Sequence, residues 1–251
     1  MNKKSVNPFS CPSPLIAHRG ASALAPENTL AAFRKAHAIG AKWVEFDVML
    51  AACGEAVVMH DETLDRTTNG SGRVIDYPYS ILKTFDAGSW FDPVFSSEKI
   101  PTLAEVLMLL CELNLGANIE IKPAEGIEED TVKKVLSVLD QHWCGNNQPL
   151  LISSFSRTVL ETVRQYSATH HLGFLMHDWE PDWQTFCDAL NCVAVDISHP
   201  VLSAERVREV KATHRLLLSY TVDDPVIARR LFDWGVDAVF SNCSPGMAVF
   251  L

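Results

Sequence analysis

Short runs of apolar and β-branched residues recur along the chain, and longer segments with a helical spacing of apolar positions separate them. A short apolar run is typical of a buried strand, whereas apolar positions three or four apart are typical of a helix packed on a core. Several helical segments open on Asn, Thr, Ser or Asp, which cap free backbone N–H groups. The predicted strands lie near residues 15–19, 43–48, 117–122, 150–155, 171–176, 193–198, 216–221 and 238–242. The predicted helices lie within residues 28–40, 102–114, 128–143, 156–170, 183–190, 203–214 and 223–235, and 183–190 has the weakest pattern.

Eight strands alternating with helices over 251 residues favour a closed (β/α)8 TIM barrel over an open sheet. We therefore expect residues 1–251 to form a single barrel domain. About residues 50–100, the alternation breaks, because this stretch has polar and aromatic runs but no crossover helix. A loop of this length is unusual unless it is functional. We expect a small insertion after the second strand, lying over the barrel mouth.

The composition is that of an ordinary globular protein, with 47% hydrophobic and 21% charged residues. The formal net charge of −10 argues against nucleic acid or an anionic membrane as a partner. No run is long and apolar enough to span a bilayer, and no apolar segment of signal-peptide length follows the N-terminal lysines. The seven cysteines include no Cys-x-x-Cys pair, which favours reduced thiols over a disulfide framework or a zinc site. We therefore expect a cytoplasmic protein without membrane insertion.

The segment LIAHRG, residues 15–20, brings His18 and Arg19 to the end of the first predicted strand. In a (β/α)8 barrel, the carboxyl ends of the strands carry the chemistry. Histidine titrates near neutral pH and suits acid/base catalysis, while arginine is a permanent cation that binds anions. The strand therefore delivers both kinds of group to the expected mouth of a site.

In VEFDV, Glu45 and Asp47 lie two residues apart and share one face of the strand. Two carboxylates facing a barrel interior are costly unless something neutralises them, and a salt-bridged pair at the rim is the alternative. The segment that follows, MLAACGEAVVMH, is interpreted as a hairpin that turns between Cys53 and Gly54. This register would place Asp47 opposite His60 on the same face. His60 is therefore expected close to both carboxylates.

In ANIEIK, Asn118, Glu120 and Lys122 share one face of the third predicted barrel strand. Three carboxylates without cysteine ligands indicate a hard-cation site, for Mg²⁺ or Ca²⁺ rather than zinc. Arg19 and Lys122 add local positive charge, which an anionic substrate needs in a chain of negative net charge. A metal ion, the basic side chains of Arg19 and Lys122, and two histidines together suit the cleavage of a phosphate ester.

The motifs HRGASALAPENT, EFDV, VVMHDETLDRTTNGSG and NIEIKP, in this order, resemble the glycerophosphodiester phosphodiesterase family. The similarity extends through DAGSWF, IPTLAEVL, LLISSF, HDWEPDW and WGVD over nearly the whole chain, and is greatest to the cytosolic bacterial members. It implies a (β/α)8 barrel with a small insertion and a divalent cation. It also implies hydrolysis of glycerophosphodiesters, such as glycerophosphocholine and glycerophosphoethanolamine, to sn-glycerol 3-phosphate and an alcohol.

The resemblance implies three sets of site residues, namely metal ligands, an acid/base pair and phosphate contacts. By position these are Glu45, Asp47 and Glu120; His18 and His60; and Arg19 and Lys122. Other residues have two interpretations each, a contact with substrate or a structural role. Asn28 would bind substrate or cap a helix, and the rest would contact substrate or serve packing; they are Trp234, Trp90, Phe91, His199 and Asp196.

The end of the chain departs from the family pattern, because SNCSPG stands where a Thr-Asp pair followed by proline is frequent. Two alternatives share the barrel. A phospholipase C-like phosphodiesterase would carry an exposed apolar or basic surface for membranes, and no such segment is evident. A non-catalytic glycerophosphodiester sensor would be expected to lack a metal ligand or a histidine, and all five are present. The sequence leaves open the preferred alcohol, the choice of metal, the roles of the two histidines and the oligomeric state.

Overall fold

A closed barrel of parallel strands forms the centre of the computed structural model, which describes residues 9, 11–144, 148–243 and 245–251. The barrel closes because β1 pairs with both β2 and β9, and the remaining strands pair in the order β9-β8-β7-β6-β5-β4-β2. Its eight strands are β1 (Leu15–His18), β2 (Trp43–Leu50), β4 (Gly116–Ile121), β5 (Leu150–Ser154), β6 (His171–Met176), β7 (Ala194–Ser198), β8 (Leu216–Tyr220) and β9 (Ala238–Ser241). The prediction of a (β/α)8 barrel is confirmed.

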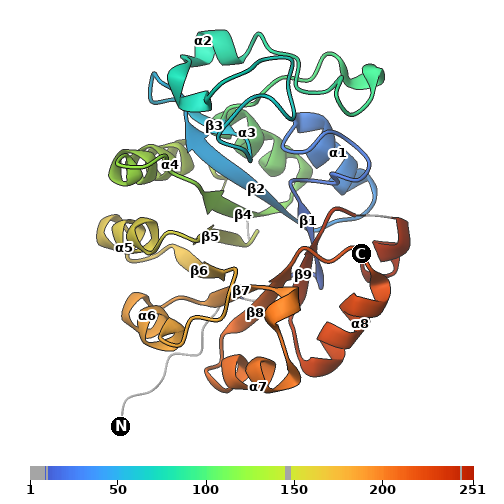
Figure 1. Cartoon of the computed structure of the whole chain (residues 1–251), viewed down its shortest axis with the longest axis vertical. Coiled ribbons are helices and arrows are strands. Elements are labelled where there is room, and N and C mark those ends of the chain that lie inside the picture. The colour runs from blue at the N-terminus through green and yellow to red at the C-terminus, as the bar shows by residue number, and fades with distance from the viewer. Residues whose placement is uncertain (1–8, 10, 145–147, 244) are drawn as a thin grey trace.

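Helices surround the barrel, as Figure 1 shows. They are α1 (Leu30–Ala38), α3 (Leu103–Leu113), α4 (Glu128–His142), α5 (Arg157–Tyr166), α6 (Trp183–Leu190), α7 (Ala204–Ala212) and α8 (Pro225–Trp234). All seven predicted helices are confirmed, including the weakly patterned one at 183–190. Side-chain caps define several of their starts, as at Thr102, whose hydroxyl accepts from the Glu105 N–H in a reciprocal capping box.

The apolar core of the barrel has two parts, one outside the strands and one inside them. Apolar residues on the outer faces of the strands pack against the inner faces of the helices. A second cluster fills the barrel interior; it includes Ile16, Trp43, Leu151, Leu218 and Phe240. The polar inward-facing residues of β1, β2 and β4 lie nearer the carboxyl ends of these strands, at positions 18, 45, 47, 118 and 120.

The segment between β2 and α3 contains a short antiparallel strand, β3 (Ala56–Val58), the single-turn helix α2 (Tyr79–Leu82) and two 3₁₀ turns (Val74–Asp76 and Pro93–Phe95). It lies beside the end of β2, at the top of Figure 1. A small apolar cluster of its own holds it together; the cluster includes Met49, Val57, Leu64, Val74, Leu82 and Ile100.

The predicted register of the β2–β3 hairpin is wrong by one residue. Val48 faces Val58 and Leu50 faces Ala56, so the loop is centred on Cys53 rather than between Cys53 and Gly54. Gly54 adopts a left-handed backbone with φ of 76°, which closes this loop. The residue opposite Asp47 is consequently Met59, whose N–H donates to the Asp47 carbonyl. His60 follows directly, after the end of β3.

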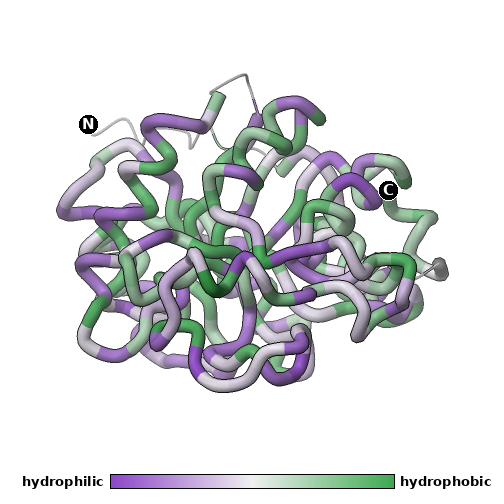
Figure 2. The backbone as a smooth tube through the Cα atoms, turned by 90° about the horizontal axis from the view of Figure 1, so that it is seen from above, coloured by the Kyte–Doolittle hydropathy of each residue, from purple (hydrophilic) through white to green (hydrophobic). Residues whose placement is uncertain are grey.

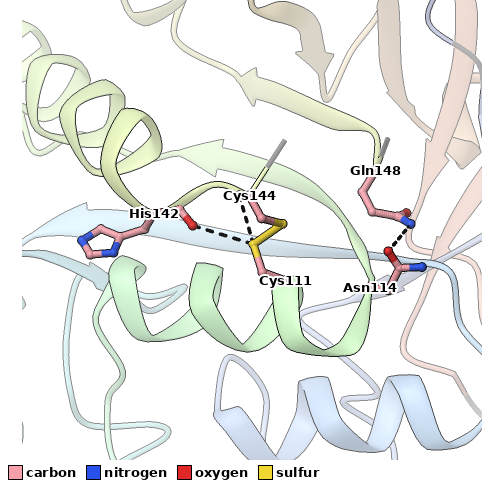
Figure 3. Close-up of a disulfide and its surroundings, with 5 residues drawn as sticks. All are labelled: Cys111, Asn114, His142, Cys144 and Gln148. Carbon is pink, nitrogen blue, oxygen red and sulfur yellow. Dashed lines mark hydrogen bonds between the residues drawn. A yellow bond between two sulfur atoms is a disulfide. The ribbon is translucent and has the colours of Figure 1, made fainter. Parts of the chain in front are cut away.

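Two cysteines form a disulfide, which corrects the expectation that the thiols are reduced. Cys111 in α3 is bonded to Cys144, two residues after the end of α4 (Figure 3). The bond therefore joins the ends of two adjacent helices. The other described cysteines are free thiols, at positions 11, 53, 187, 192 and 243.

Polar and apolar stretches alternate along the chain throughout the molecule, as Figure 2 shows. Among the described residues, no helix has both the length and the apolar character that crossing a membrane requires. The N-terminal residues considered for a signal peptide, 1–8 and 10, lie outside the described part of the chain.

Candidate active site

Strand register brings the candidate residues together at the carboxyl ends of three adjacent strands. His18 at the end of β1 lies beside Glu45 of β2, and Glu45 lies beside Asn118 of β4. One layer further on, Asp47 lies beside Glu120. Because alternate residues of a strand point to the same side, these side chains all face the barrel interior.

Glu45, Asp47 and Glu120 form a carboxylate cluster in which one ligand atom from each lies within 4.8 Å of the others. Burial, together with the charge of Asp47, raises the pKa of Glu120 to about 8. Burial and the two neighbouring carboxylates also raise the pKa of Glu45 well above its usual range. Burial alone would raise the pKa of Asp47 too, but the nearby charges of Lys122 and Arg19 hold it below its usual value.

The donor set of this cluster fits a hard divalent cation. Carboxylate oxygens are the ligands that Mg²⁺ and Ca²⁺ prefer. The raised pKa values of Glu45 and Glu120 reflect burial and repulsion among the three carboxylates, which a divalent cation would relieve. The buried Oδ1 of Asn118, without a hydrogen-bond partner in the described structure, adds a neutral oxygen donor next to Glu45.

Three polar side chains converge on Asp47. The Asn28 amide donates to its Oδ2 at 2.9 Å, the Arg19 Nε lies 3.6 Å from the same oxygen, and the Lys122 ammonium lies 3.5 Å from Oδ1. Arg19 also contacts Glu27 at 2.8 Å through Nη1 and donates its backbone N–H to Glu45. Its buried Nε has no hydrogen-bond partner in the described structure and can therefore donate to an anion.

The backbone at Arg19 and Asn28 is held in an unusual conformation. Both residues have positive φ angles, 55° and 58°, which cost free energy in residues other than glycine. The Asn28 N–H donates to the Arg19 carbonyl, so the two left-handed residues support each other. Thr29, not Asn28, caps α1, because its hydroxyl accepts from the Ala32 N–H. The alternative that Asn28 is a helix cap is therefore wrong.

The imidazole of His18 is fixed from the side opposite the carboxylates. Its Nδ1 lies 2.8 Å from Oδ1 of Asn242, which follows β9, and its Nε2 lies 3.9 Å from Glu45. Burial, reinforced by the positive charge of Arg19, lowers the pKa of His18 to about 4. The ring is therefore neutral at physiological pH in the protein without bound metal.

The second imidazole, that of His60, has a carboxylate partner. Its Nδ1 lies 2.6 Å from Asp61, which Arg66 holds through two hydrogen bonds while also contacting Glu27. The hydrogen bonds from Arg66 lower the pKa of Asp61, so that it stays ionised. Burial lowers the pKa of His60 despite this partner.

Both imidazoles face one cavity of about 240 Å³. Its lining includes His18, Arg19, Glu45, His60, Asn118, Glu120 and Lys122, together with Phe155, Tyr220 and Phe240. A second cavity, of about 400 Å³, adjoins it through the shared residues Glu120, Lys122 and Phe155. The structure thus brings eight of the predicted site residues to one place: six line the first cavity, and Asp47 lies beside it with Asn28 hydrogen-bonded to it.

Some candidates lie elsewhere. Trp234 ends α8, where it stacks with Arg230, and it is not among the residues lining either cavity. The helix runs away from the carboxyl ends of the strands, so its last residue lies at the opposite end of the barrel, and the prediction that Trp234 binds substrate is not supported. Trp90 and Phe91 pack on each other within the insertion. His199 belongs to the 3₁₀ turn after β7 and does not line the first cavity.

Asp196 faces the barrel interior and is fully buried, with neither carboxyl oxygen hydrogen-bonded within the described structure. Burial, with Glu120 nearby, raises its pKa well above the usual range. A fully buried carboxyl has no access to substrate, so the structural interpretation of Asp196 is favoured.

Sequence reasoning missed the groups that hold the two imidazoles. Asp61 directly follows His60 in the HD pair, so its role could have been noticed from the sequence. Asn242 belongs to the SNCSPG segment and lies 224 residues from His18. No local pattern links the two residues, and only the closure of the barrel brings them together.

Two imidazoles beside three carboxylates that could hold a hard cation, at the carboxyl ends of barrel strands, are groups suited to phosphoester chemistry. The sequence model of the glycerophosphoryl diester phosphodiesterase family matches residues 18–244, and the chain belongs to this family. A glycerophosphodiester phosphodiesterase of Caldanaerobacter subterraneus is 37% identical over 91% of this chain and 93% of its own. A glycerophosphodiester phosphodiesterase of Bacillus subtilis is 34% identical over 90% of this chain and 82% of its own.

A solved structure of an Oleispira antarctica phosphodiesterase in complex with the product sn-glycerol-3-phosphate is similar to this chain. The two share 39% identity with a TM-score of 0.89, covering 91% of this chain and 92% of the other. The similarity therefore includes most of the chain.

Proposed function

We propose that this chain hydrolyses glycerophosphodiesters, such as glycerophosphocholine and glycerophosphoethanolamine, to sn-glycerol 3-phosphate and an alcohol, with Mg²⁺ or Ca²⁺ as cofactor. The observation that carries the proposal is the meeting of two imidazoles, three carboxylates and two cations around one cavity. The names of the similar enzymes and the product bound to the Oleispira antarctica structure support the choice of substrate. We propose a small molecule, not a nucleic acid, as the partner.

The chain's own residues suggest how the phosphodiester is held. Arg19 and Lys122 are the cations at the cavity, and we assign both to the phosphate oxygens. Asn28 and Lys122 keep Asp47 ionised and in place. We therefore assign Asn28 to the support of the metal site rather than to direct contact with substrate.

Glu45, Asp47 and Glu120 would hold the divalent cation. What the bound cation supplies is positive charge against the phosphate oxygens, which stabilises the transition state of the displacement. Its binding also removes the repulsion among the three carboxylates. The insertion after β2 contributes His60 and one side of the adjoining cavity, and we propose that it belongs to the same domain and bounds the mouth.

The two histidines suit a route in which the 2-hydroxyl of the glycerol attacks phosphorus. One imidazole takes the hydroxyl proton, and the other gives a proton to the oxygen of the departing alcohol. The product of this step is a cyclic phosphate, which water opens with the proton transfers reversed. A substrate analogue lacking the 2-hydroxyl should therefore not be hydrolysed, and hydrolysis at the normal rate would contradict the cyclic route.

The experiment that tests the proposal measures sn-glycerol 3-phosphate released from glycerophosphocholine and glycerophosphoethanolamine by wild type, His18→Ala and His60→Ala. Each substitution should lower kcat by about 10²–10⁴-fold, the usual contribution of general acid–base catalysis. His37→Ala is the matched control, because His37 is exposed on α1. A folded wild-type protein that binds but does not hydrolyse these diesters would favour the sensor, whereas turnover of phosphoinositides at a membrane would favour the phospholipase C-like alternative.

We propose a cytoplasmic location, which the free thiols of the other described cysteines support. The Cys111–Cys144 disulfide would be an exception to the reduced state of thiols usual in that compartment. Counting reactive thiols in protein trapped directly from cells would test the location.

A further inference from the structure

A chain of hydrogen bonds leads from His18 away from the cavity and ends on a carboxylate. His18 Nδ1 lies 2.8 Å from Asn242 Oδ1, and the amide nitrogen of Asn242 donates to Asp223 Oδ2 at 2.5 Å. Asp223 lies in the loop between β8 and α8, and its other oxygen accepts two hydrogen bonds. These come from the backbone N–H of Asn242 and the hydroxyl of Ser241, each at 2.8 Å.

The donor and the acceptor of each hydrogen bond in this series follow from the chemistry of the groups. An ionised carboxylate only accepts, so the side of the Asn242 amide that faces Asp223 must be the NH₂ group. The amide oxygen then faces His18, and an oxygen only accepts. The nitrogen of His18 that faces Asn242 must therefore carry a proton.

We propose that Asp223, acting through Asn242, fixes His18 as the tautomer with its proton on Nδ1 and directs the unprotonated Nε2 toward the cavity. Asp223 and Asn242 are thus positioning residues for the proton transfer at Nε2. Nε2 is the nitrogen on the Glu45 side of the ring, and His18 lines the cavity. This inference rests on the proposed function for its catalytic consequence, but not for the tautomer itself.

The alternative tautomer is excluded by the contacts of Asp223. A proton on Nε2 would leave a lone pair on Nδ1, and the Asn242 amide would have to turn its NH₂ group toward it. The amide oxygen would then face Asp223 Oδ2, acceptor against acceptor, at a distance of a short hydrogen bond. The hydroxyl of Ser22 lies 2.8 Å from both Asn242 Oδ1 and the His18 carbonyl oxygen, and its one proton can go to either, so this contact does not decide the amide orientation.

Asp223→Asn should reverse the tautomer without changing the shape of the site. The backbone N–H of Asn242 can only donate, so the oxygen of the new amide must stay next to it. The NH₂ group of the new amide then faces Asn242, whose own oxygen must turn toward it. Its nitrogen now faces His18 Nδ1, which can accept only if the ring proton moves to Nε2.

The experiment is ¹⁵N NMR of the histidine rings, with and without Mg²⁺, combined with steady-state kinetics. In wild type, His18 should show a protonated Nδ1 and an unprotonated Nε2, and in D223N the reverse. D223N should also lower kcat by about 10²–10⁴-fold, the size of lost acid/base catalysis, with KM little changed. The double variant N242D/D223N restores an acceptor toward His18 and should recover both the tautomer and most of kcat.

Ser22→Ala is the control for the NMR measurement, because a rotatable hydroxyl does not dictate the amide orientation, and His18 should keep its proton on Nδ1. A wild-type His18 protonated on Nε2, or D223N with an unchanged tautomer, would overturn the inference. A reversed tautomer with unchanged kcat would overturn the catalytic consequence. The tautomer is measured even if no glycerophosphodiester is hydrolysed, so failure of the proposed function is distinguishable.

Discussion

Glu45 and Asp47 lie on one strand and are both buried, yet their surroundings shift their pKa values in opposite directions. Both lie beside the third carboxyl, Glu120, and both are almost fully buried. The pKa of Asp47 is lowered because Arg19, Lys122 and the Asn28 amide surround it, whereas the pKa of Glu45 is raised well above its usual range. The surroundings therefore favour the charged form of Asp47 and disfavour that of the other two carboxyls, and a bound cation would favour the charged form of all three.

Without metal, the protein should lose stability as the pH rises from 6.5 to 8. In this range unfolded glutamate has lost the proton that folded Glu120, with its pKa raised to about 8, still holds. The free energy of unfolding therefore falls with pH, by up to about 1.4 kcal/mol per pH unit for each such group. The lowered pKa of His18, to about 4, acts in the opposite direction only below about pH 6.5, the usual histidine value.

Urea unfolding in EDTA across this pH range measures the effect. Glu120→Gln should make the unfolding free energy depend less on pH. It removes one carboxyl with a raised pKa, and it removes a charge that raises the pKa of Glu45. Stability that is constant or rises with pH in the chelated wild type would contradict the protonation of the cluster.

At the scale of elements, the turn between β1 and α1 sets the position of the site. Gly20 follows His18 and Arg19 with φ of 78°, and a Cβ atom there would lie 2.7 Å from backbone and side-chain atoms of Ala32. The turn therefore packs directly on α1. The same turn places His18 and Arg19 at the end of β1, and it is followed by Asn28, whose N–H donates to the Arg19 carbonyl before α1 begins.

Gly20→Ala should destabilise the protein by about 2–5 kcal/mol, which combines a left-handed backbone, about 1–2 kcal/mol, with overpacking, about 1–3 kcal/mol. Gly40→Ala is the matched control, because Gly40 also has a positive φ, 100°, but nothing within 4 Å of its Cβ position. The control should lose only the backbone contribution. Equal losses of unfolding free energy in the two variants would show that Gly20 is not closely packed.

At the scale of the whole molecule, local periodicity made the barrel and most of the site predictable. The period of two along a strand placed Glu45 with Asp47, and Asn118 with Glu120, on one face. The hairpin register was wrong by one residue because it depends on the loop conformation around Gly54. Asn242, Asp223 and Arg66 could not be predicted as partners of site residues, since each acts through a contact that only the folded chain creates.

We propose that the carboxylate cluster makes this barrel a metal-dependent phosphodiesterase. The most direct measurement is the release of sn-glycerol 3-phosphate from glycerophosphocholine by EDTA-treated protein, before and after Mg²⁺ or Ca²⁺ is added. We expect no release in EDTA, recovery with one or both cations, and no recovery in the variant E45Q/E120Q, whose folding is checked by thermal unfolding. Equal release with and without EDTA, or full recovery in that variant, would contradict it.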